Sequence, residues 1–288
     1  MKIVPDWVFV IWEHWRAHGA FPNVLQPTTF CGKVLHRILF ERSEWFTETT
    51  DKYRVRAYVE ECLGADVLPK LLYVTDDPAT IPFDDLPARF IVKPTHASGW
   101  FEAVYDKDSI DREKLIAQCR EWLAQSFYEV HREWAYKNIV RRILVQELID
   151  DGSGALPTDY RLYVFSGKPA FISVDRDQDA IGCCRFYDLS WRQLAVSNGR
   201  PEIAGDIPAP KHLSEMIQAA KILARNTTFV RIDFFDTEAQ FYFVEMTWTP
   251  NCGLHAFHPP VYERQFGDLW KLDQGNAPPM RQSLRAVP

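Results

Sequence analysis

Two acidic residues in the last quarter of the chain are the clearest candidates for metal chemistry. Asp233 and Glu245 lie in two β-prone segments, residues 229–235 and 241–248, that flank a turn-forming stretch. This pattern predicts a β-hairpin, and alternation places each carboxylate on a defined face of its strand. If the strands pair in register, two like charges become neighbours in an aromatic setting and need a cation. Oxygen ligands of this kind favour Mg²⁺ or Mn²⁺ over zinc.

The same hairpin allows a second interpretation without a metal. One or both carboxylates face solvent, or Glu245 forms an ion pair with Arg231, which lies two residues before Asp233. The spacing alone does not distinguish an ion pair from a metal site, because both need a cation beside the same carboxylate.

A lysine at the end of an earlier strand is a candidate for phosphate binding. Lys93 precedes Pro94, which stops the strand, and a loop of small residues follows up to Gly99. Such a loop can present backbone N–H groups to phosphates while the ammonium supplies a point charge. The G-x-x-x-x-G-K pattern is absent. A surface turn beside a lysine that extends into solvent is the alternative.

Two other strand ends carry groups that recognise ligands. The segment Gln146–Ile149 ends an apolar strand, and its backbone can bind the edge of an adenine; a plain edge strand is the alternative. Arg161 and Arg176 are predicted on the two strands of a second hairpin. Guanidinium groups bind phosphate or carboxylate through two hydrogen bonds, but cross-strand ion pairs explain them equally well.

The cysteines do not indicate a metal or disulfide framework. Cys252, His255 and His258 are spaced unlike a standard zinc site, so we favour a substrate-facing loop there. The chain has 6 Cys and lacks a C-x-x-C pair and a secretory signal, which predicts reduced thiols.

Composition limits the class of protein. The net charge is −6 and no basic run stands out, which argues against general nucleic-acid binding. No stretch approaches the roughly 20 apolar residues of a membrane span. We therefore expect a cytoplasmic protein without a transmembrane segment.

The elements that must position these residues are helices and antiparallel strands, which together predict an α+β fold. Helices are expected at residues 6–20, 51–64, 111–136 and 208–225. We interpret the aromatic stripe of the first helix as packed on the core, with a partner-docking face as the alternative. The stripe consists of Trp7, Phe9, Trp12 and Trp15.

In order, several short segments resemble the TupA-like branch of the ATP-grasp superfamily, named for a teichuronopeptide-synthesis protein. The resemblance runs from about His18 to about Leu272. The segments that carry it include His18–Asn23, Thr50–Val59, Leu68–Leu71, Phe90–Lys93, His96–Trp100, Asp159–Arg161, Val230–Asp233, Glu245–Pro250 and Phe266–Leu269.

The resemblance implies an ATP-grasp fold, in which two α+β lobes with antiparallel sheets hold ATP between them. A short helical N-terminal segment, residues 1–50, would precede the lobes. The N-terminal lobe with the phosphate loop would cover residues 51–150, and the C-terminal lobe with the metal and substrate site residues 151–288.

The resemblance also implies roles for individual residues. Lys52 and Lys93 would contact the nucleotide phosphates, under a loop that contains His96, Ser98 and Gly99. Glu147, Leu148 and Ile149 would form the hinge that reads adenine. Asp233 and Glu245 would bind the metal ion, and Arg231 an anion. Thr247 stands where many relatives have Asn, so the third metal ligand is Thr247 or Asn251.

The implied activity is an ATP-dependent ligase that joins a carboxylate to an amine through an acyl phosphate. Its catalytic residues would be Lys93, Arg161 and Arg231, with ATP and Mg²⁺ or Mn²⁺ as cofactors. The carboxylate would belong to a small molecule or a cell-surface glycan, and an amine donor would be the second substrate. The alternatives are a kinase that phosphorylates a glycan hydroxyl and a nucleotide-binding partner without activity.

Overall fold

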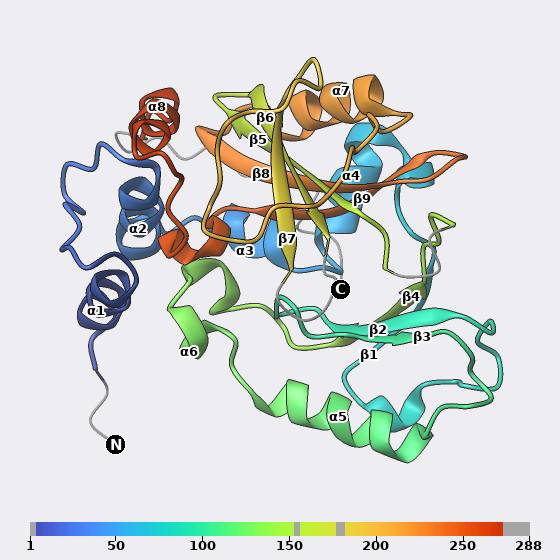
Figure 1. Ribbon diagram of the computed structural model, residues 1–288. Helices are drawn as coiled ribbons and strands as arrows, with labels where there is room; N and C mark the ends of the chain where they lie inside the picture. Colours follow the sequence, from blue (N-terminus) through green and yellow to red (C-terminus); the bar gives the residue numbers. More distant parts are fainter. Residues whose placement is uncertain (1–3, 153–155, 177–181, 273–288) are drawn as a thin grey trace.

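The computed structural model describes residues 4–152, 156–176 and 182–272, and its described part contains two antiparallel sheets (Figure 1). The smaller sheet has the order β1 (Leu71–Thr75), β4 (Ile143–Glu147), β2 (Phe90–Pro94) and β3 (Glu102–Val104). The larger has the order β7 (Cys183–Asp188), β6 (Lys168–Arg176), β5 (Asp159–Phe165), β8 (Phe229–Asp236) and β9 (Phe241–Thr247). The predicted α+β class is therefore confirmed.

One helix, α5 (Arg112–Ala124), packs on the smaller sheet. Its N-cap is Asp111, whose side chain accepts a hydrogen bond from the Lys114 N–H. Leu115 and Trp122 of the helix share a buried cluster with the strand residues Phe90 and Val145, which holds the helix against the sheet.

The prediction of a single helix at residues 111–136 is wrong. After Ala124 the backbone becomes extended at Gln125 and resumes as α6 (Tyr128–His131) and a 3-10 turn at Trp134–Tyr136. Arg132 takes a left-handed conformation with φ 60°, which ends α6. The break turns the chain so that Glu133 enters the protein interior.

The two faces of the larger sheet are covered by different helices, as alternation along the strands requires. On one face, α7 (Leu213–Leu223), α4 (Val55–Leu63) and α3 (Glu44–Thr50) bury residues such as Ile232 and Phe234. The domain boundary predicted between residues 50 and 51 therefore falls between two helices, α3 and α4, that pack in the same core. The domain boundaries remain predictions.

The other face of the larger sheet is half aromatic and half charged. Helices α2 (Phe30–Phe40) and α8 (Val261–Leu269) cover Phe165, Phe171 and Phe229. Further along the same face, Arg161 and Asp233 replace the aromatic residues. Helix α1 (Asp6–His18) packs on α2 at the far left of Figure 1.

Three other expectations need correction. The helix predicted at 51–64 begins only at Val55, because the Asp51 side chain accepts hydrogen bonds from Tyr53 and Arg54 and holds a turn. The helix predicted at 208–225 is shorter, because only Leu213–Leu223, which forms α7, is helical. On α1 the tryptophans are 44–60% exposed, so their predicted burial is wrong; Val10 and His14 face the core instead.

In the part of the chain that the structure describes, no helix combines the length and apolar character needed to cross a bilayer.

Two neighbouring residues of α7 test how this helix contributes to stability. Leu223 is fully buried and Ile222 is 39% exposed. We expect Leu223→Ala to lower the free energy of unfolding by about 2–5 kcal/mol, because it leaves a cavity. Ile222→Ala, the control on the same helix, should cost roughly 0.5 kcal/mol. Urea denaturation measures both, and equal losses would contradict this packing.

Candidate functional site

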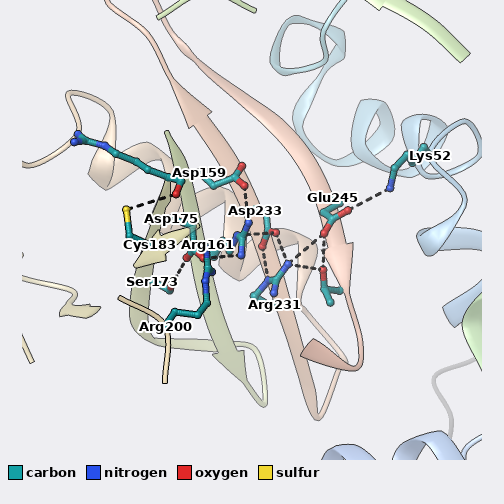
Figure 2. Close-up of polar contacts among 12 residues, drawn as sticks. Lys52, Asp159, Arg161, Ser173, Asp175, Cys183, Arg200, Arg231, Asp233 and Glu245 are labelled. Carbon is teal, nitrogen blue, oxygen red and sulfur yellow. Dashed lines mark hydrogen bonds and ion pairs between the residues drawn. The ribbon is translucent and has the colours of Figure 1, made fainter. Parts of the chain in front are cut away.

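The charged half of the larger sheet contains the predicted acidic pair. Asp233 on β8 lies directly opposite Glu245 on β9, and Arg161 on β5 lies opposite Asp233. The predicted pairing of Asp233 with Glu245 is therefore confirmed, although the register of the hairpin shifts between Asp233 and Phe234. Figure 2 shows the two carboxylates with Arg231 between them and Lys52 approaching Glu245 from the other side.

Lys52 reaches this pair from the turn between α3 and α4. Its Nζ lies 3.3 Å from Glu245 Oε2. Its backbone N–H donates to the carbonyl of Thr95, which directly follows β2, at 3.2 Å. Thr95 is fully buried, and its hydroxyl donates to the Val140 carbonyl. One residue therefore connects the smaller sheet to the acidic pair of the larger sheet.

A cavity of about 320 Å³ lies between the two sheets. This volume is within the range of small-molecule sites. Apolar residues such as Ile91, Phe235 and Val244 contribute to its walls. Most of the sequence-predicted residues line it as well: Lys52, Lys93, Ser98, Gly99, Glu147, Leu148, Ile149, Arg161, Asp233 and Glu245.

Lys93 is the second lysine that lines this cavity. Among the described residues, no hydrogen bond or ion pair to its ammonium is found. Burial, followed by repulsion from Lys52, lowers the pKa of Lys93 to about 7. A polyanion such as a nucleoside triphosphate fits this position, because it would compensate the positive charges of both lysines.

The electrostatics of the acidic pair differ between its members. Burial raises the pKa of Asp233 to about 7, although Arg231 opposes the shift. Burial also opposes ionisation of Glu245, but Lys52 and Arg231 outweigh it and lower the pKa of Glu245 to about 2. The pair thus keeps at least one firm negative charge at neutral pH.

The donor set fits a divalent cation with two protein carboxylates. Nη2 of Arg231 lies 2.6 Å from Asp233 Oδ2, 3.2 Å from Glu245 Oε1 and 3.0 Å from Thr247 Oγ1. A guanidinium nitrogen therefore occupies the cation position among the three predicted metal ligands. No cluster of three or more His, Cys, Asp or Glu suited to a metal is found in the described residues. Mg²⁺ is commonly held by one or two carboxylates plus substrate phosphates.

Three predicted residues, His96, Arg231 and Thr247, are not among those that line the cavity. The prediction that the His96 side chain faces the phosphates is wrong. Its side chain is buried, with Nε2 3.1 Å from the carbonyl of Trp122 at the end of α5. The backbone of the predicted loop reaches the cavity through Ser98 and Gly99 instead.

Arg161 lines the cavity but already has anionic partners. Its guanidinium donates to Asp159 and Asp175, each at 2.7 Å, and Arg200 also donates to Asp175. The cross-strand ion pairs considered as an alternative are therefore formed. The sequence-based prediction gave roles to the arginines of these two strands and none to Asp159 or Asp175, although their alternation with Arg161 and Ser173 was an available signal.

The Cys252, His255 and His258 group does not form a zinc site in the structure. Cys252 contacts the buried carboxylate of Glu133, whereas both histidines are exposed. Glu133 accepts a hydrogen bond from Thr249 Oγ1, and burial raises its pKa to about 7. No sequence signal identified Glu133, because it lay inside an expected helix.

Lys93→Met tests the buried ammonium through stability without ligand. The pKa of the Lys93 ammonium is 10.5 in the unfolded chain and about 7 in the folded protein. The unfolding free energy of the wild type therefore rises as the pH increases from about 7 to 10.5. The Met variant should be more stable than the wild type below about pH 7 and lack this rise. Denaturant titrations at several pH values measure it, with the exposed Lys70→Met as control. Lower stability of Lys93→Met at every pH would contradict the assignment.

Several solved ligase structures are similar to this chain at low identity. D-alanine–D-alanine ligase from Bacillus anthracis is 18% identical over 77% of this chain and 66% of its own, with a TM-score of 0.45. VanG D-Ala:D-Ser ligase from Enterococcus faecalis is 14% identical over 77% and 60%, with a TM-score of 0.44. The ATP-grasp ligase PsnB, with a minimal precursor, Mg and ADP, is 15% identical over 76% and 58%, with a TM-score of 0.39.

The chain spans only 54% and 56% of the first two matching structures, which are D-alanine–D-alanine ligase from Bacillus anthracis complexed with ATP and PsnB complexed with a phosphomimetic variant of its minimal precursor, Mg and ADP. A search of curated proteins gives no significant match. The family described as TupA-like ATPgrasp matches residues 33–271, which is most of the chain. The cavity between two antiparallel sheets, with its lysines and acidic pair, agrees with that match. The chain therefore belongs to the TupA-like ATP-grasp family.

Proposed function

We propose that this protein is an ADP-forming ligase that joins a carboxylate to an amine. The contact of 3.3 Å between Lys52 and Glu245 is the observation that carries the proposal. It places the early lysine and the late acidic pair on one cavity, which Lys93 and the residues 147–149 also line. Family membership supports ATP as the nucleotide.

In this proposal the cavity holds ATP with its adenine against the backbone of Glu147–Ile149 and its phosphates near Lys52 and Lys93. The two ammonium groups would neutralise charge on the phosphates as the terminal phosphoryl group is transferred. Asp233 and Glu245 would hold a Mg²⁺ ion, which would supply stabilisation of the negative charge that develops on the phosphates. Arg231, which now contacts both carboxylates, would then be released to bind an anion.

The chemistry proceeds in two steps. A carboxylate oxygen attacks the terminal phosphorus, the bond to the bridging oxygen breaks, and ADP leaves with the electron pair. An uncharged amine then attacks the acyl carbon, the C–N bond forms, and phosphate leaves while protons pass to solvent. Ser98 and Gly99, on the loop beside Lys93, would restrict water that otherwise hydrolyses the intermediate.

The carboxylate we propose belongs to a uronic acid or peptide of a cell-surface polysaccharide, by analogy with the family's namesake. A cytoplasmic location is part of this proposal. It is consistent with the 6 cysteines, none of which forms a disulfide in the described structure.

The test is ADP release with a panel of carboxylates, namely glucuronic acid, UDP-glucuronic acid and glutamate, each with glycine or ethanolamine. Release should require both substrates and Mg²⁺. Hydroxylamine should trap the acyl phosphate as a hydroxamate, which a phosphorylated hydroxyl cannot form. Release that needs only a sugar hydroxyl would contradict the ligase and favour a kinase.

A variant of the acidic pair tests the metal-binding role. Glu245→Gln keeps the shape but removes the charge that pairs with Lys52. We expect it to slow ADP release by about 100-fold or more, a typical loss for one electrostatic contact to the reacting groups. Raising the Mg²⁺ concentration should recover part of the rate. The control is Glu238→Gln on the exposed hairpin turn, and equal rates for both variants would refute the role.

A further inference from the structure

Asp159, the first residue of β5, is a part of the cavity wall that the proposed chemistry does not use. One oxygen, Oδ2, accepts a hydrogen bond from Arg161 Nη2 at 2.7 Å. The other, Oδ1, is buried and has no hydrogen-bond partner among the described residues. Native proteins rarely leave a buried carboxylate oxygen unpaired, so this one calls for an explanation.

The neighbouring carboxylates differ from Asp159 in this respect. Asp175 also lines the cavity, but its Oδ2 receives both Arg161 and Arg200, and its Oδ1 accepts from Ser173. Asp233 is held by Arg231 through both oxygens. Among the described residues, Asp159 is therefore the carboxylate of this wall with a buried oxygen that has no hydrogen-bond partner.

The surroundings of Asp159 suit a cationic group. The nearest positive charge, on Arg161, is already shared by Asp159, Asp175 and, at 3.7 Å, Asp233. These carboxylates compensate Arg161, so its charge does not oppose an incoming cation (Figure 2). For the same reason Arg161 is poorly suited to bind a substrate carboxylate, and it serves to orient Asp159. The other positive charges of the cavity, on Lys52 and Lys93, are those that the proposed function assigns to the phosphates.

Strand geometry places Asp159 next to the reaction. Asp159 pairs with Phe235 across β5 and β8, whereas Arg161 pairs with Asp233. Asp159 is thus the diagonal neighbour of Asp233 on the same face of the sheet. Diagonal neighbours of this kind lie about 7–8 Å apart, a separation that a small group bound to Asp159 can bridge.

We propose that Asp159 binds the ammonium group of the amine substrate, an inference that rests on the ligase function proposed above. Aliphatic amines are protonated near neutral pH, so the cavity must first accept them as cations. The ammonium donates to the free Oδ1 and lies beside the acidic pair. It then loses one proton to solvent, and the neutral nitrogen attacks the acyl carbon. The substrate class is a primary aliphatic amine.

Asp159→Asn tests this inference, because it keeps the shape of the side chain but removes the charge. The variant is assayed with the carboxylate of the panel that gives the fastest hydroxamate formation. Two nucleophiles are compared at about pH 8: glycine, whose amine is protonated, and hydroxylamine, which is mostly uncharged. The control is Asp188→Asn, which removes an arginine-paired carboxylate of β7 outside the cavity.

For Asp159→Asn we expect the KM for glycine to rise about 10- to 100-fold, as for loss of a hydrogen bond to a charged group. The rate with hydroxylamine and the thermal shift caused by Mg-ATP should stay near those of the wild type and of the control. Equal losses with both nucleophiles, or a weaker ATP shift alone, would overturn the role of Asp159. Wild-type protein that forms neither hydroxamate nor ADP with any substrate would instead overturn the ligase function itself.

Discussion

Charge compensation around Glu245 is the constraint on which the rest of the site depends. A carboxylate this deep between two sheets is stable only beside cations, and its partners come from distant parts of the sequence. Lys52 arrives from the turn between α3 and α4, and Arg231 from the neighbouring strand. The Lys52 backbone also donates a hydrogen bond to Thr95, which follows β2 of the smaller sheet, so the residue that neutralises Glu245 also contacts the segment next to the other sheet.

One face of the larger sheet serves two purposes along its length. Its aromatic half is sealed by α2 and α8, and its charged half borders the cavity. Because side chains alternate strictly along a strand, the rigid packing around Phe165 and Phe229 fixes the direction in which Arg161 and Asp233 point. The aromatic cluster thereby supports the orientation of the charged groups beside it, and such support is what a preorganised site requires.

The sequence was most informative where a period of two residues was clear. It predicted the β8–β9 hairpin and the register of Asp233 against Glu245, because alternation and a turn determine both. It failed at 111–136, where helical periodicity hid the break at Gln125, and at His96, whose burial under the end of α5 is a tertiary effect. Helices α2 and α3 and strand β7 were not predicted individually. The partners of Arg161 on β6, and Arg200 far along the chain, could not be read from spacing either.

The position of Arg231 has a consequence for the order in which ligands enter. Its guanidinium is an internal counter-ion, tethered by the chain and therefore present at a high effective concentration beside Asp233 and Glu245. A bare divalent ion has to compete with this tethered charge for the same oxygens. An ion that arrives already chelated by a polyphosphate brings anions that the displaced guanidinium can bind. In the ligase proposed above, this arrangement would favour entry of the metal as its nucleotide complex over entry of the free ion.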